Sequence, residues 1–417
     1  MPRRIGLRWW IIALVMVGTI VNYLTRSSLA VAAPALLADL HIDERHYSWI
    51  NGTFQAGLMM QPLVGYLLDL IGLRVGIALF ATGWALLTAA HGLAGNWQGL
   101  AALRGALGFA EGTSHTGGLK IVSEWFPAKE RGIAGGIYNL GASAGAALAA
   151  PLVAGAILLW SWRAAFFVCG ALALAWVGLW LLFYAPPERH RLISPAEKAK
   201  IVEGREAHVR AEGTRPPVLA ILRQRNFWGI ALPRFLADPT WGTLTIWMPL
   251  YLTRVRGFDL AHIALFAFLP FVAADLGCMT GPALTLWFQR RGLKLIDARR
   301  AAFTCGAVLM TGTIFIGWVD SAAVAIALLC LAGFAHQILS VTVITMATDL
   351  FRQNEVGTVA GLAGLLGNGG VLLSTLAIGA MVAAIGYAPF FALWGLLDVA
   401  GAIILWTFVR APVSEAT

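Results

Sequence analysis

The chain has 417 residues, of which 59% are hydrophobic and 12% are charged. A water-soluble domain needs charge over most of its surface, so this composition excludes one. The net charge of +9 would suit a nucleic-acid-binding protein, but the charges are concentrated between apolar segments, which argues against that partner.

Apolar segments follow one another along the whole chain. A helix of about 20 residues crosses the roughly 30 Å of membrane hydrocarbon at about 1.5 Å per residue. We therefore predict an all-α membrane protein with twelve transmembrane helices. Their expected positions are 9–32, 47–69, 74–94, 97–122, 132–157, 163–184, 227–254, 261–286, 300–319, 321–349, 356–384 and 387–409.

The Lys and Arg residues predict how the chain is oriented. If the N-terminus is inside the cell, 22 of the 30 lie in cytoplasmic segments and 4 in external loops. The other four lie within apolar spans, as Arg26, Arg104, Lys120 and Arg234. Positive charge collects on the cytoplasmic side of membrane proteins. We expect both termini in the cytoplasm, and a multi-pass membrane protein.

One long polar stretch divides the spans six and six. We expect an N-terminal bundle at 1–184, a cytoplasmic linker at 185–226 and a C-terminal bundle at 227–417. An offset of 225 residues aligns the fourth and fifth spans with the tenth and eleventh, with nine identities over 38 positions. About three identities would be expected by chance. The halves are therefore predicted to be duplicates.

Duplicated six-helix bundles are typical of transporters that bind substrate between the halves, near the middle of the membrane. The alignment pairs Glu111 with His336, and both fall near the middle of their spans. We expect these two titratable side chains to face one another across a central cavity.

Several motifs resemble known transporters. The stretch from Gly65 to Arg74 looks like the Gly-x-x-x-Asp-x-x-Gly-x-Arg signature of the major facilitator superfamily. More specific are Asn22-Tyr23-Leu24-Thr25-Arg26, Glu124-Trp125-Phe126-Pro127-Ala128-Lys129-Glu130-Arg131, Phe227-Trp228-Gly229-Ile230-Ala231-Leu232-Pro233-Arg234-Phe235-Leu236, Gly333-Phe334-Ala335-His336-Gln337 and Asn354-Glu355-Val356. Together these motifs resemble the anion:cation symporter family, and within it the bacterial hexuronate transporters.

The resemblance implies a proton-coupled symporter for galacturonate and glucuronate. It implies that Arg26 holds the substrate carboxylate, that Glu111 carries the proton, and that Arg104 accompanies it. Two features depart from relatives. Thr25 stands where the galactonate branch has Asp, and the second span reads Thr53-Phe54-Gln55-Ala56-Gly57-Leu58, without the tyrosines expected to face sugar.

The residue chemistry by itself favours the same site. A charged side chain near the bilayer centre costs about 2.5 to 3.5 kcal/mol on insertion scales, so it persists when paired or useful. Arg26 lies one turn beyond Asn22, and its planar fork fits a carboxylate. The alternatives are structural: an interhelical ion pair of Arg26, or a permanent Arg104–Glu111 pair. Arg104, Gly108, Glu111 and His115 form one stripe.

Neutral polar groups beside aromatic rings are suited to sugar hydroxyls. For that role we expect Asn139, Trp241, His336, Gln337 and Asn368. We expect conformational gating from charged residues near span ends and from an acid in the seventh span, which could instead pair with Arg234. These are Asp69, Arg74, Glu130, Arg131 and Asp238. Gly141 and Gly145 predict close helix packing.

The prediction is therefore a symporter rather than an enzyme, with no cofactor and with the proton as coupling ion. Motifs for a membrane enzyme or a Walker loop are missing, and the 42-residue linker is too short for the output domain of a sensor. The four cysteines lack metal-binding spacing. We expect a monomer in the lipid bilayer whose partners are a sugar acid and protons. A symporter for another organic anion, such as the aldonate galactonate, stays open.

Overall fold

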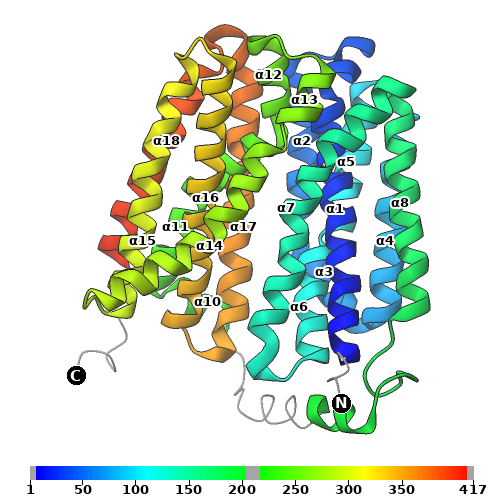
Figure 1. The fold of residues 1–417 in the computed structure, drawn as a ribbon, viewed down its shortest axis with the longest axis vertical. Coiled ribbons are helices and arrows are strands. Elements are labelled where there is room, and N and C mark those ends of the chain that lie inside the picture. Colours follow the sequence, from blue (N-terminus) through cyan, green and yellow to red (C-terminus); the bar gives the residue numbers. More distant parts are fainter. Residues whose placement is uncertain (1–5, 203–216, 411–417) are drawn as a thin grey trace. The chain divides into compact units, whose positions relative to one another are not determined.

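The computed structural model describes residues 6–202 and 217–410 of the chain, and all of its regular structure there is helical (Figure 1). Backbone contacts divide the chain into two compact units. Unit 1 comprises Met1–Leu40 and Ala56–Gly213, and unit 2 comprises His41–Gln55 and Thr214–Thr417. The boundary falls inside a helix that the sequence analysis placed in the first half.

Except for α10, which lies in the predicted linker, the helices named here occur where the sequence predicts apolar spans. The first group is α1 (Leu7–Asp39), α2 (Glu44–Leu58), α3 (Gln61–Ile71), α4 (Leu73–His91), α5 (Trp97–Glu111), α6 (Thr113–Trp125), α7 (Ala128–Leu159) and α8 (Trp162–Phe183). The second is α10 (Val218–Leu222), α11 (Arg225–Ile246), α12 (Met248–Arg256), α13 (Leu260–Phe266), α14 (Leu269–Arg290), α15 (Leu295–Met310), the 3-10 helix η1 (Thr311–Gly317), α16 (Ala322–Leu350), α17 (Gln353–Ile385) and α18 (Ala388–Phe408).

Five of the twelve predicted spans are broken into two consecutive helical segments: α2–α3, α5–α6, α11–α12, α13–α14 and α15–η1. Proline explains three of the breaks. Pro62, Pro249 and Pro270 stand in the first turns of α3, α12 and α14, where their missing N–H costs nothing. The chain can therefore change direction there without losing a helical hydrogen bond.

Nine segments of the described chain are long and apolar enough to cross a membrane, and the α2–α3 pair, bent by 46°, makes a tenth. The two remaining predicted spans are α5–α6 and α11–α12. These two spans are not counted because their helical segments are short or carry charge. The charged residues include Arg104, Glu111 and Lys120 in α5–α6, and Arg234 and Asp238 in α11–α12. The weakest membrane signals therefore belong to spans with several charged side chains, whereas Arg26 and His336 lie in spans that are long and apolar enough.

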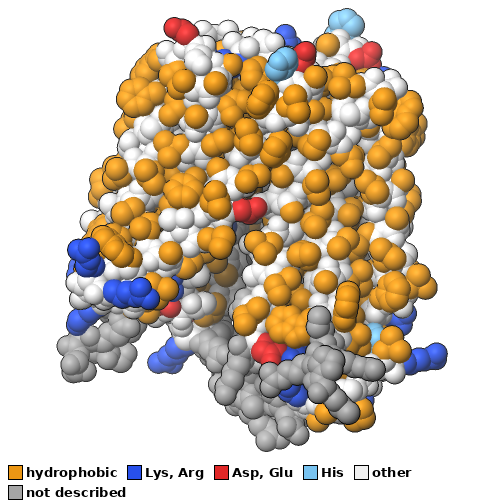
Figure 2. All heavy atoms as spheres, viewed as in Figure 1, with side chains coloured by type: hydrophobic (Ala, Val, Ile, Leu, Met, Phe, Trp, Pro, Cys, Tyr) orange, Lys and Arg blue, Asp and Glu red, His pale blue; other side chains and the backbone are white. Residues whose placement is uncertain are grey.

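The outer surfaces of the helices are apolar. Figure 2 shows hydrophobic side chains over most of the visible surface, with Lys and Arg gathered near the start of α1 in unit 1 and near the start of α15 in unit 2. Large side chains such as Leu159, Leu182 and Leu265 are exposed. Apolar patches of this extent identify a surface in contact with lipid.

Glycines set the closest helix contacts in each unit. A Cβ at Gly141 or Gly145 of α7 would lie 2.6 or 2.3 Å from a backbone carbonyl oxygen of α1. The predicted close packing is therefore confirmed, and the helix partner is α1. In unit 2, a Cβ at Gly370 of α17 would lie 2.2 Å from the carbonyl oxygen of Phe235 in α11. Gly145 and Gly370 are aligned by the 225-residue offset, so the two units repeat this contact.

Within unit 2, the first part of α2 packs on α11, on the turn that follows α11 and on α17. The Tyr47 hydroxyl donates to the carbonyl oxygen of Ile246 at 2.8 Å, and its ring lies edge-on to Trp247 at 5.2 Å. A Cβ at Gly379 of α17 would lie 2.1 Å from the Cβ of Ser48. These contacts explain why residues 41–55 group with unit 2.

Candidate functional site

An ion pair joins α1 to α5 inside unit 1. The Nε of Arg26 donates to the Oε2 of Glu111 at 2.8 Å. The Glu111 side chain is 0% exposed, whereas that of Arg26 is 23% exposed. The carboxylate is therefore enclosed, whereas the Arg26 side chain remains partly exposed.

The residues around Arg26 fix its position. The guanidinium carbon lies 4.5 Å from the centre of the Tyr23 ring, and one Nη donates to the Oδ1 of Asn22 at 3.4 Å. The Thr25 hydroxyl lies 2.8 Å from the carbonyl oxygen of Asn22 and 3.4 Å from Oε1 of Glu111. Sequence reasoning missed Tyr23 and Thr25 as contacts, although both belong to the motif that ends at Arg26.

Arg104 holds α5 against α1. Its Nη2 donates to the backbone carbonyl of Arg26 at 2.7 Å, and its side chain is buried. Its charge also acts on Glu111, but the ion-pair contact described for Glu111 comes from Arg26. Two positive charges therefore surround one enclosed acid. The side chain of His115, the last member of the predicted stripe, lies outside the described residues.

Unit 2 has its own polar cluster on α11 and α16. Arg234 donates to Asp238 at 3.2 Å, one helical turn apart. The ring of Trp241, a further turn along, stacks on His336 with centres 5.6 Å apart and planes inclined by 17°. His336 is buried, and its Nδ1 has no hydrogen-bond partner among the described residues. The pair therefore offers an aromatic face and a polar ring atom.

A glycine allows this cluster to reach α17. A Cβ at Gly367 would lie 2.0 Å from the Oδ2 of Asp238, so a larger side chain there would displace the carboxylate.

The remaining predicted hydroxyl-binding residues lie next to His336, next to Gly367 and on α7. Gln337 and Asn368 are half-buried, and Asn139 is exposed on α7. The prediction that Glu111 faces His336 stays a prediction.

The predicted gating residues of the Gly65–Arg74 stretch have partners within unit 1. Asp69 on α3 forms an ion pair with Lys120 on α6, and Lys120 also donates to the carbonyl oxygen of Gly65 at 2.7 Å. Arg74 donates to the carbonyl oxygen of Leu181 at 2.8 Å. Lys120 was recognised only as a charge within a span. Its partner could not be read from the sequence because the two residues are 51 positions apart.

The start of α7 forms a second charged cluster. Glu130 accepts from the Nε of Arg8 at 2.8 Å and pairs with Lys200, which lies in the helical residues 195–202 of the linker. Burial acts to raise the pKa of Glu130, but the hydrogen bonds from Lys200 and Arg8 outweigh it and hold that pKa below its usual value. Arg131 donates to the carbonyl oxygen of Phe126 at 3.1 Å.

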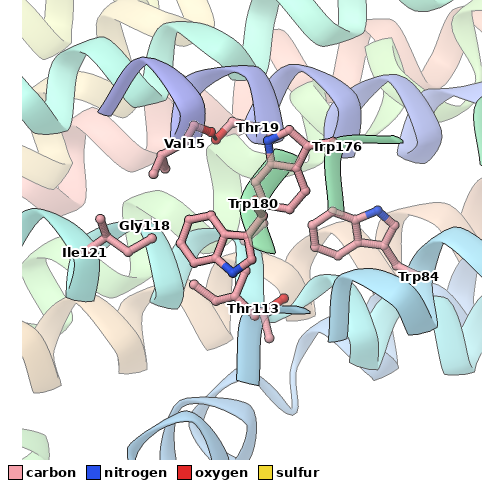
Figure 3. Close-up of a pocket in the computed structure, with 11 residues that line it drawn as sticks. Val15, Thr19, Trp84, Thr113, Gly118, Ile121, Trp176 and Trp180 are labelled. Carbon is pink, nitrogen blue, oxygen red and sulfur yellow. Dashed lines mark hydrogen bonds between the residues drawn. The ribbon is translucent and has the colours of Figure 1, made fainter. Parts of the chain in front are cut away.

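A small cavity lies elsewhere in unit 1, among α1, α4, α6 and α8. Indole rings of Trp84, Trp176 and Trp180 line it together with the hydroxyl-bearing Thr19 and Thr113, as Figure 3 shows. Its lining includes none of the residues predicted to bind substrate. We therefore assign the cavity to helix packing and the candidate site to the Arg26–Glu111 region.

Comparisons with known proteins identify the fold and its relatives. The sequence pattern of the major facilitator superfamily matches residues 15–375. The hexuronate transporter of Escherichia coli (strain K12) is 47% identical over 408 residues, which cover 97% of this chain and 94% of that protein. The galacturonate transporter of Dickeya chrysanthemi is 48% identical over 325 residues, covering 77% and 94%.

A solved structure has the same fold. It is a bacterial homolog of the human lysosomal transporter Spinster, in an inward-facing and unoccupied conformation, with a TM-score of 0.73 and 17% identity over 96% of this chain and 95% of that one. At this identity the likeness concerns the fold alone. The sequence match, however, covers most of the chain, and the chain therefore belongs to the major facilitator superfamily.

Proposed function

We propose that this protein imports hexuronates, galacturonate and glucuronate, together with protons, by alternating access. It does so across the bacterial inner membrane, with both termini in the cytoplasm. The observation that carries the proposal is the Arg26–Glu111 pair, in which a partly exposed arginine side chain is neutralised by an enclosed acid. Relatives named as hexuronate and galacturonate transporters support the choice of substrate.

The pair provides a physical basis for coupling. A hexuronate carboxylate can take two parallel hydrogen bonds from the guanidinium of Arg26. The substrate then competes with Glu111 for the same positive charge. An enclosed carboxylate that loses its counter-charge is costly, so Glu111 gains a proton when the substrate binds. Each ligand therefore favours the binding of the other, which is the thermodynamic requirement for symport.

The hydroxyl groups of the sugar need a separate set of contacts. We assign them to the stacked Trp241–His336 pair, with Gln337, Asn368 and Asn139 as further candidates. An aromatic face beside neutral donors and acceptors suits a pyranose ring. Arg234 pairs with Asp238 within α11 itself, and we assign the substrate carboxylate to Arg26, whose partner Glu111 is the proposed proton carrier.

Counterflow into proteoliposomes tests the substrate. Labelled galacturonate should enter liposomes preloaded with galacturonate, and external glucuronate should compete with it strongly. Galactonate should compete weakly, and neutral galactose should not compete. Equal competition by galactose would show that the carboxylate is not recognised. Stronger competition by galactonate would favour the second candidate, an aldonate symporter.

The proton-coupling role of Glu111 is tested by Glu111→Gln. Glutamine keeps the size and hydrogen-bonding capacity of a protonated glutamate but cannot release a proton. We expect this variant to lose accumulation driven by a pH gradient and to retain galacturonate exchange. Exchange in the same preparation is the control for folding, and undiminished proton-driven accumulation would reject the proposal.

A further inference from the structure

A buried acid that the proposed mechanism does not use lies in α18. Asp398 is 0% exposed, in the middle of a helix that is otherwise apolar in its buried face. Neither of its carboxyl oxygens has a hydrogen-bond partner among the protein groups that the structure describes. An ionised carboxylate in such a place would be neither hydrated nor paired.

The surroundings of Asp398 are closely packed. One turn before it, a Cβ at Gly395 would lie 3.1 Å from the carbonyl oxygen of Met310 and from the hydroxyl of Thr313. One turn after it, a Cβ at Gly401 would lie 3.5 Å from Pro233 of α11. The same face of α18 is therefore covered by α11 on one side and by the α15–η1 segment on the other.

The charged groups on these neighbouring elements have partners of their own. Arg234 donates to Asp238 in α11, and in the first turns of α15 Arg299 donates to Asp349 while Arg300 donates to Asp297. The group that acts electrostatically on Asp398 is the like-charged Asp238. The remaining titratable groups of α15 and α17 are Cys305 and Glu355, and η1 has none.

We propose that Asp398 is a second proton-binding site of this protein, and that its carboxyl group carries a proton in the conformation described here. A neutral acid fits an enclosed position without a counter-charge, whereas a carboxylate does not. The site belongs to unit 2, so it is separate from Glu111 in unit 1. The inference does not depend on which anion the protein transports.

The bound proton has a consequence for α11. Ionisation of Asp398 would place a second negative charge near Asp238, which forms an ion pair with Arg234 on the adjoining helix α11. Repulsion between these two negative charges would weaken the hold of α11 on α18 near Pro233 and Pro239, where α11 lacks two backbone donors. The proton at Asp398 therefore protects the packing of this helix pair.

Infrared spectroscopy of the full-length purified protein tests the proposal without a transport measurement. A protonated carboxylic acid has a C=O stretching band that is well separated from carboxylate bands and shifts in heavy water. At neutral pH, the spectrum of the wild type minus that of Asp398→Asn should contain this band. The matched control is Asp275→Asn on α14, which replaces a half-buried acid. The spectrum of this variant should retain the protonated-acid band of the wild type. A difference spectrum with only carboxylate bands would overturn the proposal.

A second measurement serves if Asp398→Asn does not fold. The wild-type protein is produced with aspartate carrying a heavy carbon isotope in its side-chain carboxyl group, which lowers the frequency of any aspartic acid band. The protonated-acid band at neutral pH should shift with this label. A spectrum that lacks the band, or in which no component of it shifts with the label, would show that Asp398 is ionised.

Discussion

At the scale of single residues, the structure brings the charges of Arg26 and Glu111 together in one ion pair. Arg26 and Glu111 are 85 positions apart, and the ion pair between α1 and α5 brings them to 2.8 Å. From the sequence, structural pairing and ligand binding were alternative roles for Arg26. The structure contains the pair and leaves the Arg26 side chain partly exposed beside a fully enclosed Glu111, and the proposed mechanism assigns both roles to Arg26.

Arg26→Lys tests whether the planar fork of the guanidinium matters. Lysine keeps the charge but offers one compact donor group, which cannot bind a carboxylate bidentately and also reach Glu111. A hydrogen bond to a charged group contributes about 1.5 to 3 kcal/mol, so the loss of one should weaken galacturonate binding at least about 10-fold. Titration calorimetry with purified protein measures the affinity.

The control for this substitution is Arg163→Lys. Arg163 pairs with Asp39 at 2.7 Å, but its side chain is 42% exposed, so the pair contributes little. That variant should bind galacturonate like the wild type. Unchanged affinity in Arg26→Lys would mean that the substrate carboxylate binds elsewhere.

Charged residues within apolar spans can be recognised from the sequence, but one of them, Asp398, was not selected as a candidate. Arg26, Arg104 and Glu111 were selected from the resemblance to a transporter family and from the cost of charge near the bilayer centre. Asp398 lies in the predicted span 387–409 and satisfies the same rule about intramembrane charge, yet no motif pointed to it. The rule was sufficient to find it, whereas the absence of any protein partner could be learned only from the fold.

At the scale of elements, glycine contacts decide which helices pack most closely. Gly145→Ala would place a methyl group 2.3 Å from the carbonyl oxygen of Ile20, so α1 and α7 must separate. We expect a lower melting temperature in detergent and reduced uptake. In an open position of a helix the same change stabilises by roughly 1 kcal/mol, because alanine has the higher helix propensity.

Gly155→Ala in the same helix is the matched control. No described heavy atom beyond its immediate chain surroundings lies within 4 Å of the Cβ that this change adds. Its melting temperature should equal or slightly exceed that of the wild type. Similar destabilisation in both variants would mean that α7 does not tolerate alanine for reasons other than contact with α1.

At the scale of the whole molecule, a charged cluster connects the linker to the helices of unit 1. Glu197 of the linker accepts from the backbone N–H of Leu7 at 2.9 Å and from the side chain of Arg8 at 2.7 Å, and Lys200 pairs with Glu130. A carboxylate at the start of α1 satisfies backbone donors that the helix leaves free. The linker is thus tied to α1 and α7 by matched charges.

This cluster should make stability depend on pH. The pKa of Glu130 in the folded protein lies below the ordinary value of 4.5, so pairing stabilises the fold above pH 4.5 and is lost as the pH falls through the lowered pKa. We expect the melting temperature of Glu130→Gln to lie below that of the wild type at neutral pH. The difference should shrink as the pH falls below 4.5, and a difference that stays constant would contradict this assignment.

The sequence by itself determined the class of the molecule and the twelve helical spans. These follow from local quantities, namely the length of apolar runs and the penalty for charge in lipid, and they need no knowledge of neighbouring helices. The internal repeat can also be recognised from the sequence alone. Its structural meaning appeared in Gly145 and Gly370, which make equivalent contacts in the two units.

Only the tertiary structure decided which charges meet. Lys120 with Asp69, Arg26 with Glu111 and the linker's Lys200 with Glu130 are contacts between residues 51 to 85 positions apart. Sequence spacing fixes the face of a helix on which a residue lies, but not the helix that packs on that face. That choice depends on the packing of all the helices in a unit. The enclosure of Glu111 and that of Asp398 depend on the same packing.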